Sequence, residues 1–440
     1  MLLTRCLFLS IVALAPDVRA QAQPEYDLLL KGGHVIDAKN RISAVRDVAI
    51  KDGKVATVAA DIPIASALKA INVAGLYVTP GIIDIHVHCY TGTGERGSYA
   101  GDLSVYPDGF TFRNGVTTVA DAGGAGWRNF EDFLDRVINR SRTRVLAFIN
   151  IVGNGMRGGK FEQNLKDMGA KPTAEMALKH KDVIVGVKSA HYTGPEMAPF
   201  IRAVEAAQTA GIKVMVDYGS NRPERPLYDL LTKVLRPGDI YTHCFSGLRG
   251  EQEGDTGGPG KALIDGRKRG VIFDVGHGGG SFAWRVAVPI VKAGFVPDSI
   301  STDLHVSSMN SGMKDMLNVM DKFLAMGLSV DDVIARSTWN PAREIQREDL
   351  GHLSVGAPAD VAVLKLEKGS FGFVDMHGAR MDGTMKLIAE MTVRGGKIVW
   401  DLNGLSRERW DKLPAGYGPQ GDPLWDAYGR GGRRRPATKQ

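Results

Sequence analysis

Two histidines, His86 and His88, stand two residues apart at the end of the apolar run in PGIIDIHVH. Residues i and i+2 of a β-strand point to the same face, so both imidazoles can reach one metal ion. Taken alone, the pair is equally compatible with two structural histidines. Its position at the end of the first of a series of apolar runs favours a metal site.

Further residues with metal-binding side chains end or follow later apolar runs. His243 ends IYTH, Asp303 ends ISTD, and His277 follows FDVG. Imidazole and carboxylate groups are suitable donors for zinc and similar divalent ions. Any one of the three could be structural, but together they place metal-type residues at the ends of successive predicted strands.

Lys188 ends another of these runs, in VIVGVKSAHY. A charged lysine is costly to bury at the end of an apolar strand. One interpretation is a lysine that reaches the rim of the fold or forms a salt bridge. The other is a neutral amine that adds carbon dioxide to give a carbamate, an anion able to bridge two metal ions about 3.5 Å apart.

The elements that must position these residues form a regular series of strands and helices. Helical patterns fill the gaps between the strands, for example at Asn129–Asn139, Met197–Ala210 and Asp315–Met326. Eight such units predict an α/β fold, a closed parallel (β/α)₈ barrel of the TIM type with its chemistry at the carboxyl ends of the strands. An open doubly wound sheet is the alternative, but no glycine-rich dinucleotide loop begins the series. The eight predicted strands are Gly81–His88, Val116–Asp121, Val145–Val152, Val183–Lys188, Ile212–Asp217, Ile240–His243, Val271–Val275 and Ser299–Asp303.

The two ends of the chain carry a different, strand-rich pattern. The segments LLLKGGHVID and MTVRGGKIVW look alike, and Asp52-Gly53 lies in a strong hairpin signal. Single strands are expected at Tyr26–Ile36 and Asp360–Leu364. We therefore expect a small β-sandwich from 21–78 plus 350–403, a barrel over 79–349, and an extension over 404–440 with a disordered basic end.

The first residues are typical of an export signal. Arg5 supplies a positive charge, Cys6 to Ala15 are mostly apolar, and Val18-Arg19-Ala20 offers a cleavage site after small residues. This pattern predicts a signal peptide over 1–20 and a periplasmic or secreted protein, with a membrane-tethering helix as the alternative. No later segment is apolar and long enough to span a bilayer. Cys89 and Cys244 would remain in the mature chain, and we expect two free, buried thiols, with one bridge in an oxidising periplasm as the alternative.

Composition excludes several classes of protein. The chain has 440 residues, 43% of them apolar, and a formal charge of +6. Most of that charge lies in the leader and the basic end, so the folded body is near neutral. The sequence therefore does not predict the clustered positive charge that is typical of nucleic-acid binding. A small-molecule substrate is the expected partner, and association with further copies of the chain stays open.

Six motifs together resemble the amidohydrolase superfamily, and more narrowly its bacterial deacetylase branch, which is related to dihydroorotases. They are PGIIDIHVH, GVKSAHY, THCFSG, DVGHGGGSF, STDLH and WNPA. The resemblance extends from Asp27 to Asn403, nearly the whole mature chain. The first motif is shared across the superfamily, whereas the combination is specific.

The resemblance implies a set of metal ligands. His86, His88 and Asp303 would bind one ion, Lys188 as a carbamate would bridge to a second, and His243 would bind that second ion. Where relatives usually place another histidine, this sequence has Asp217, in IKVMVDYG. We interpret Asp217 as a ligand, and the alternative is a second site that is weak or empty. Zinc is the expected ion, one or two per chain, with manganese as an alternative.

The implied reaction is hydrolysis of an acyl amide or ester bond by a metal-bound hydroxide. Asp303 would take the proton from water and pass it to the leaving group. His277, in its glycine-rich setting, would orient the substrate or stabilise an oxyanion. Arg157, with Arg96 and Arg222, could pair with a substrate carboxylate, as in an N-acyl amino acid.

Two alternatives to this function remain at the level of sequence. One is hydrolysis of a cyclic amide, as in dihydroorotase-like enzymes. The other is a non-catalytic binding protein on a decayed barrel, an interpretation that the unusual Asp217 motivates. His191 and His305 lie beside the ligand motifs and are expected at the rim of the site or behind its ligands.

Overall fold

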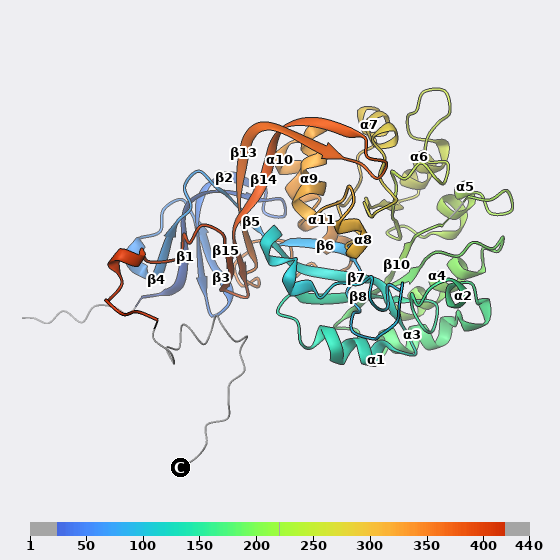
Figure 1. Cartoon of the computed structure of the whole chain (residues 1–440), viewed down its shortest axis with the longest axis horizontal. Coiled ribbons are helices and arrows are strands. Elements are labelled where there is room, and N and C mark those ends of the chain that lie inside the picture. Colours follow the sequence, from blue (N-terminus) through green and yellow to red (C-terminus); the bar gives the residue numbers. More distant parts are fainter. Residues whose placement is uncertain (1–23, 220, 419–440) are drawn as a thin grey trace, which may run out of the picture.

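The computed structural model describes residues 24–219 and 221–418, which form two sheets with helices around one of them (Figure 1). The expected export signal and the basic C-terminal end lie outside the described residues. Within them, no helix is long and apolar enough to cross a membrane. Cys89 and Cys244 are buried and unbridged, as the sequence predicted.

The first sheet is parallel, and its seven strands follow one another in chain order. All six residues of its first strand are buried, as expected for a strand covered on both faces in an α/β fold. The strands are β6 (Ile82–Val87), β7 (Val116–Gly126), β8 (Arg144–Asn150), β9 (Ile184–Ser189), β10 (Lys213–Val216), β11 (Ile240–Tyr241) and β12 (Ile272–Phe273). Their positions confirm seven of the predicted runs.

The eighth predicted strand lies between the two edges of this sheet without forming a ladder. Ser299 makes an isolated parallel bridge to Asp274, just beyond β12, and Leu304 makes another to Val87 of β6. The α/β class and a curled parallel sheet are therefore confirmed. Closure into an eight-stranded barrel stays a prediction.

Helices follow most strands and cover the outside of the curled sheet (Figure 1). Helix α4 ends at Gly211, whose φ of 71° gives the left-handed turn that glycine adopts readily. Helix α9 begins after Asp315, whose side chain accepts a hydrogen bond from the Asn318 amide. The helices are α1 (Phe130–Phe133), α2 (Gly159–Glu162), α3 (Ala170–Lys179), α4 (Ala198–Ala210), α5 (Leu227–Asp229), α6 (Lys261–Lys268), α7 (Trp284–Lys292), α8 (Val306–Met309), α9 (Met316–Ala325), α10 (Val330–Ala335) and α11 (Trp339–Glu344).

The second sheet joins the two ends of the chain, as predicted. Strand β5 pairs in parallel with β1 of the N-terminal segment and antiparallel with β13 of the C-terminal segment. The sheet order is β15-β14-β13-β5-β1-β2-β3, with β4 also on β1. The strands are β1 (Tyr26–Asp37), β2 (Ile42–Lys51), β3 (Lys54–Ala59), β4 (Ala67–Asn72), β5 (Tyr77–Pro80), β13 (Val361–Val374), β14 (Arg380–Arg394) and β15 (Lys397–Asp401). A two-layer sandwich stays a prediction.

The hairpin of β13 and β14 is much longer than the sequence suggested, because only its two ends, at Asp360–Leu364 and from Met391 onward, have a clear strand pattern. Its far part carries glycines and exposed polar residues, and it reaches across to α9 and α7 (Figure 1). At its turn, Asp375 accepts a hydrogen bond from the Trp284 amide at 3.0 Å. The Met376 amide donates to the carbonyl of Phe282. The small sheet thus holds a loop of the parallel-sheet region.

Candidate metal centre

Three of the predicted ligands, His86, His88 and Asp303, converge where β6 ends beside the segment that follows β12. Asp303 Oδ1 lies 2.9 Å from His88 Nε2 and 3.6 Å from His86 Nε2. All three residues are buried, and each offers a ligand atom within 4.8 Å of the other two. The structure therefore brings together the set that the sequence assigned to one ion.

The protonation of His86 shows that this set fits a cation. Its Nδ1 donates to Thr242 Oγ1 at 2.9 Å, and that hydroxyl donates to Asp274 Oδ2 at 2.7 Å. Burial lowers the pKa of His86 to about 3, so the ring is neutral and Nε2 carries a lone pair. A lone pair and a carboxylate oxygen then face each other, a contact that a metal ion between them would make favourable. Such an outer partner for a ligating histidine is typical of metal sites.

Lys188, at the end of β9, lies beside this set. Its Nζ is 3.2 Å from His86 Nε2 and 3.5 Å from Met215 Sδ, and the side chain is buried. Burial lowers the pKa of Lys188. Within the described residues Lys188 forms no ion pair, so the salt bridge considered at the level of sequence is absent there.

Asp217 and His243 lie just after the neighbouring strands β10 and β11. Asp217 Oδ2 lies 3.3 Å from His243 Nε2 and 3.3 Å from His191 Nε2. The other oxygen, Oδ1, accepts a hydrogen bond from Arg249 Nη2 at 2.7 Å. Sequence reasoning missed Arg249, which lies in the loop after β11 and belongs to no recognisable motif.

The glycine-rich loop after β12 packs directly against the ligands. A Cβ on Gly276 would lie 2.8 Å from His243 Nδ1, and one on Gly278 would lie 2.4 Å from Asp303 Oδ2. Both glycines have positive φ, as do His243 and Asp303 themselves. Non-glycine residues rarely adopt this conformation, and it is concentrated at functional sites. The two glycines therefore allow the backbone of this loop to pack directly against His243 and Asp303.

His277, in the same loop, has both ring nitrogens engaged by the protein. Its Nε2 lies 2.6 Å from Lys322 Nζ, its Nδ1 lies 2.9 Å from the Gly278 carbonyl, and its ring stacks on Phe282. The side chain is fully buried. The predicted catalytic and substrate-binding role of His277 stays a prediction, and the structure places the ring behind the loop rather than in the cavity described next.

A cavity of about 420 Å³ opens over Asp303, Asp217 and His243. Tyr99, which sequence reasoning also missed, lies in its wall with its ring 4.5 Å from that of His88. The remaining lining residues are His191, Arg249, Gly279, Gly280, Ser281, His305, Ser307 and Ser311. The cavity is large enough for a small-molecule substrate and is rich in hydrogen-bonding groups.

The arginines predicted to bind substrate lie elsewhere. Arg157 pairs with Glu95 and covers the ring of Phe161, and it lines a neighbouring cavity of about 220 Å³. Arg96 and Arg222 are exposed. A role for Arg157 in substrate binding therefore stays a prediction, and the structure does not bring it to the metal ligands.

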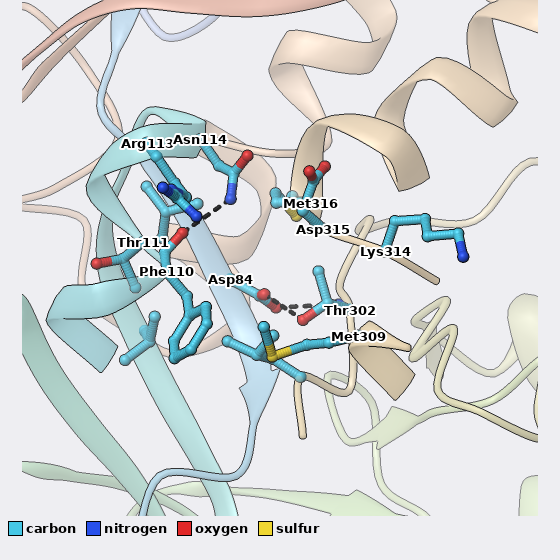
Figure 2. A pocket seen from close by; sticks show the side chains of 13 residues that line it. Asp84, Phe110, Thr111, Arg113, Asn114, Thr302, Met309, Lys314, Asp315 and Met316 are labelled. Atoms are coloured by element: carbon cyan, nitrogen blue, oxygen red, sulfur yellow. Dashed lines mark hydrogen bonds between the residues drawn. The ribbon is translucent and has the colours of Figure 1, made fainter. Parts of the chain in front are cut away.

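A smaller cavity of about 120 Å³ is lined by Asp84 of β6 and by Thr302 (Figure 2). Asp84 and Thr302 face each other in its wall, and the Thr302 hydroxyl donates to Asp84 Oδ2 at 2.5 Å. Asp84 Oδ1 also accepts from the His86 and Thr302 amides. Asp84 thus ties the two segments that carry His86 and Asp303.

A curled parallel sheet with a buried His–His–Asp set at its carboxyl edge defines the class of metal-dependent amidohydrolases, and comparison with known proteins agrees. Residues 284–399 match the amidohydrolase family profile. A deacetylase from Agrobacterium fabrum is 32% identical over 339 residues, 74% of this chain and 80% of the relative. The chain therefore belongs to the amidohydrolase family, which confirms the resemblance and the prediction of a hydrolytic enzyme.

Two solved structures extend this similarity over the whole fold. The crystal structure of an adenine deaminase matches with a TM-score of 0.78 and 29% identity, covering 86% of this chain and all of that one. The crystal structure of a dihydroorotase matches with a TM-score of 0.72 and 29% identity, covering 85% of this chain and 99% of the other.

Proposed function

We propose that this protein is a metal-dependent hydrolase that cleaves an acyl amide or ester bond of a small molecule, as a deacetylase does. The observation that carries the proposal is the convergence of His86 Nε2, His88 Nε2 and Asp303 Oδ1 beside an open cavity. The relationship to a deacetylase over most of the chain supports the choice of bond.

A divalent ion bound there would polarise the scissile carbonyl and lower the pKa of a water molecule. Asp303 lines the cavity and can accept the proton of that water, then return it to the leaving nitrogen or oxygen. Tyr99 and His305, on the cavity wall, can orient the acyl group by hydrogen bonding. The glycine loop packs closely against Asp303, since a Cβ on Gly278 would lie 2.4 Å from Asp303 Oδ2.

Several finer features belong to the same proposal. Zinc suits a site with two imidazoles and a carboxylate. Lys188 is buried beside His86, forms no ion pair among the described residues and has a lowered pKa, which supports a carbamate there as a further ligand. The bridges at Ser299 and Leu304 support closure of the curled sheet into a (β/α)₈ barrel, and we propose that the smaller sheet folds over as a β-sandwich. Export to the periplasm or medium is proposed from the first twenty residues alone.

Hydrolysis of a cyclic amide is the second candidate, favoured by the structural match to a dihydroorotase. It would use the same ligands and the same proton transfer through Asp303. The third interpretation, a non-catalytic binding protein, is disfavoured because a decayed site has no reason to keep the His86–Thr242–Asp274 chain behind an unprotonated Nε2.

The decisive experiment combines metal analysis of the purified protein with a panel of N-acetyl amino acids, acyl esters and cyclic amides. We expect bound zinc and turnover of an acyl amide or ester. His88→Ala should lose the metal, whereas His34→Ala, in the small sheet, should keep it. A metal-free protein that turns over none of the panel would favour the binding-protein interpretation.

A further inference from the structure

Arg249 is a buried cation fixed in the wall of the substrate cavity. Its side chain donates from three nitrogens: Nη2 to Asp217 Oδ1 at 2.7 Å, Nε to the Gly219 carbonyl at 2.8 Å, and Nη1 to Ser246 Oγ at 3.0 Å. The residue is 4% exposed. Because the guanidinium is held in three directions, it cannot move aside for another cation.

A second layer of contacts holds the loop that carries Arg249. Its backbone amide donates to Glu251 Oε2 at 2.9 Å, and the Ser246 hydroxyl donates to Glu251 Oε1 at 2.5 Å. Glu251 is fully buried. The loop therefore presents the guanidinium at a defined position rather than as a solvated surface charge.

The partner of this guanidinium is the residue that the family resemblance places in a second metal site. Asp217 Oδ1 already accepts from Arg249 and from the Gly219 amide. Arg249 also cancels the charge of Asp217. A guanidinium stays protonated in proteins, so its positive charge persists at any working pH.

The charge balance of the cavity then matches a single divalent ion. With Asp217 neutralised by Arg249, and with His191 paired to the buried Glu162 at 2.6 Å, the predicted ligands leave two negative charges, one on Asp303 and one on a Lys188 carbamate. Two negative charges balance one ion of charge +2. A second ion would lie next to a fixed cation and would bring two further positive charges, so the residues present do not fit it.

We propose that the positive charge of Arg249 replaces the charge of a second metal ion. The enzyme then binds one divalent ion per chain, at His86, His88 and Asp303. This inference rests on the proposed function and goes beyond it by fixing the number of ions and naming the residue that sets it. Asp217 and His243 then form the cavity wall instead of a second metal site.

The test is metal stoichiometry. The full-length protein, freed of metal by chelation and kept in bicarbonate buffer, is titrated with Co²⁺ while the visible absorption and the spin coupling between neighbouring ions are followed. The wild type is compared with Arg249→Gln, which removes the charge but keeps a donor, and with Arg249→Lys, which keeps the charge. Arg225→Gln is the matched control, since Arg225 is also buried but donates to the backbone carbonyls of Gly194, Tyr218 and Tyr192 instead of to a carboxylate.

We expect one Co²⁺ per chain and no spin coupling in the wild type, Arg249→Lys and Arg225→Gln, and a second, coupled ion in Arg249→Gln. Two coupled ions in the wild type would overturn the proposal even if no variant folds, and would leave the hydrolase function intact. One ion in a folded Arg249→Gln would also overturn it. Failure of the wild type to bind any ion would instead count against the proposed function itself.

Discussion

The imidazole of His86 donates from Nδ1 to the hydroxyl of Thr242 at 2.9 Å, which fixes the tautomer that leaves Nε2 free toward Asp303. Thr242 is fully buried on the segment that follows β11, one residue before His243. A residue just after β11 thus sets the tautomer of a histidine on β6, and we expect metal binding to depend on this contact.

Loss of the Thr242 hydroxyl should weaken metal binding. Thr242→Val keeps the shape but leaves His86 Nδ1 without its partner, and outer partners of this kind are typically worth about 10–100-fold in metal affinity. Competition with a chromophoric chelator measures the change. Thr173→Val, which removes a buried threonine hydroxyl on α3, should leave the affinity unchanged. Equal affinities for all three proteins would show that Thr242 does not control the ligand.

Removal of the Lys188 amine should cost both metal and activity if the lysine carries a carbamate. Lys188→Ala leaves a buried space beside His86 Nε2 and no anion to complete the site. Short-chain carboxylic acids such as propionate should partly restore turnover by taking the carbamate position. Full metal occupancy with normal turnover in Lys188→Ala would eliminate the carbamate.

Replacement of the Asp303 carboxylate should affect turnover more than metal binding. Asp303→Asn retains an oxygen that can still ligate, but it cannot accept a proton. A positioned general base contributes about 10²–10⁴-fold to the rate, so we expect kcat to fall by at least that factor while part of the metal is retained. If the variant keeps most of its kcat, Asp303 is not the base.

Asp321 on α9 should make the protein less stable as pH rises. Burial raises the pKa of this carboxyl from 3.8 to about 8, while its oxygen accepts from the Leu387 amide on β14. Between these two pH values the folded chain holds a proton that the unfolded chain releases, so stability falls with rising pH.

Asp321→Asn keeps the hydrogen bond to Leu387 and removes the titration. At pH 8 the substitution should raise the free energy of unfolding by more than about 1.4 kcal/mol, which is measured as a higher thermal midpoint. At pH 4 the thermal midpoint should change little. Asp331→Asn, on the exposed start of α10, is the control and should show no such difference. A pH-independent effect of Asp321→Asn would contradict the assignment.

Export is tested on the protein as the producing cell makes it. N-terminal sequencing of the mature protein should begin near Gln21, because Val18-Arg19-Ala20 is the expected cleavage site. Recovery of a soluble cytoplasmic form that still begins at Met1 would argue against export.

The parts of the fold that sequence predicted well are those with continuous apolar runs or clear helical patterns. The strand that carries His86 and the helix α9, which begins after Asp315, belong to this group, because burial leaves a periodic local signature. The far half of the β13–β14 hairpin was missed, because its residues are half-exposed and gain their partners only in the folded chain.

The residues of the candidate site also fall into a group that sequence predicted and a group that it missed. Ligand-type residues at strand ends could be assigned from spacing and resemblance, and His86, His88 and Asp303 do meet. Arg249 and Tyr99 lie in loops, which have no periodic sequence pattern that could predict them. Their role depends on contacts across the cavity. Arg157 looked suited to a substrate carboxylate, yet its loop directs it to Glu95.

The contact between Asp375 and the Trp284 amide has a consequence for when the protein can first work. The glycine loop beside Asp303 leads into α7, and α7 is held from outside by a turn encoded late in the gene. A ribosome must therefore release nearly the whole polypeptide before that loop has all its supports.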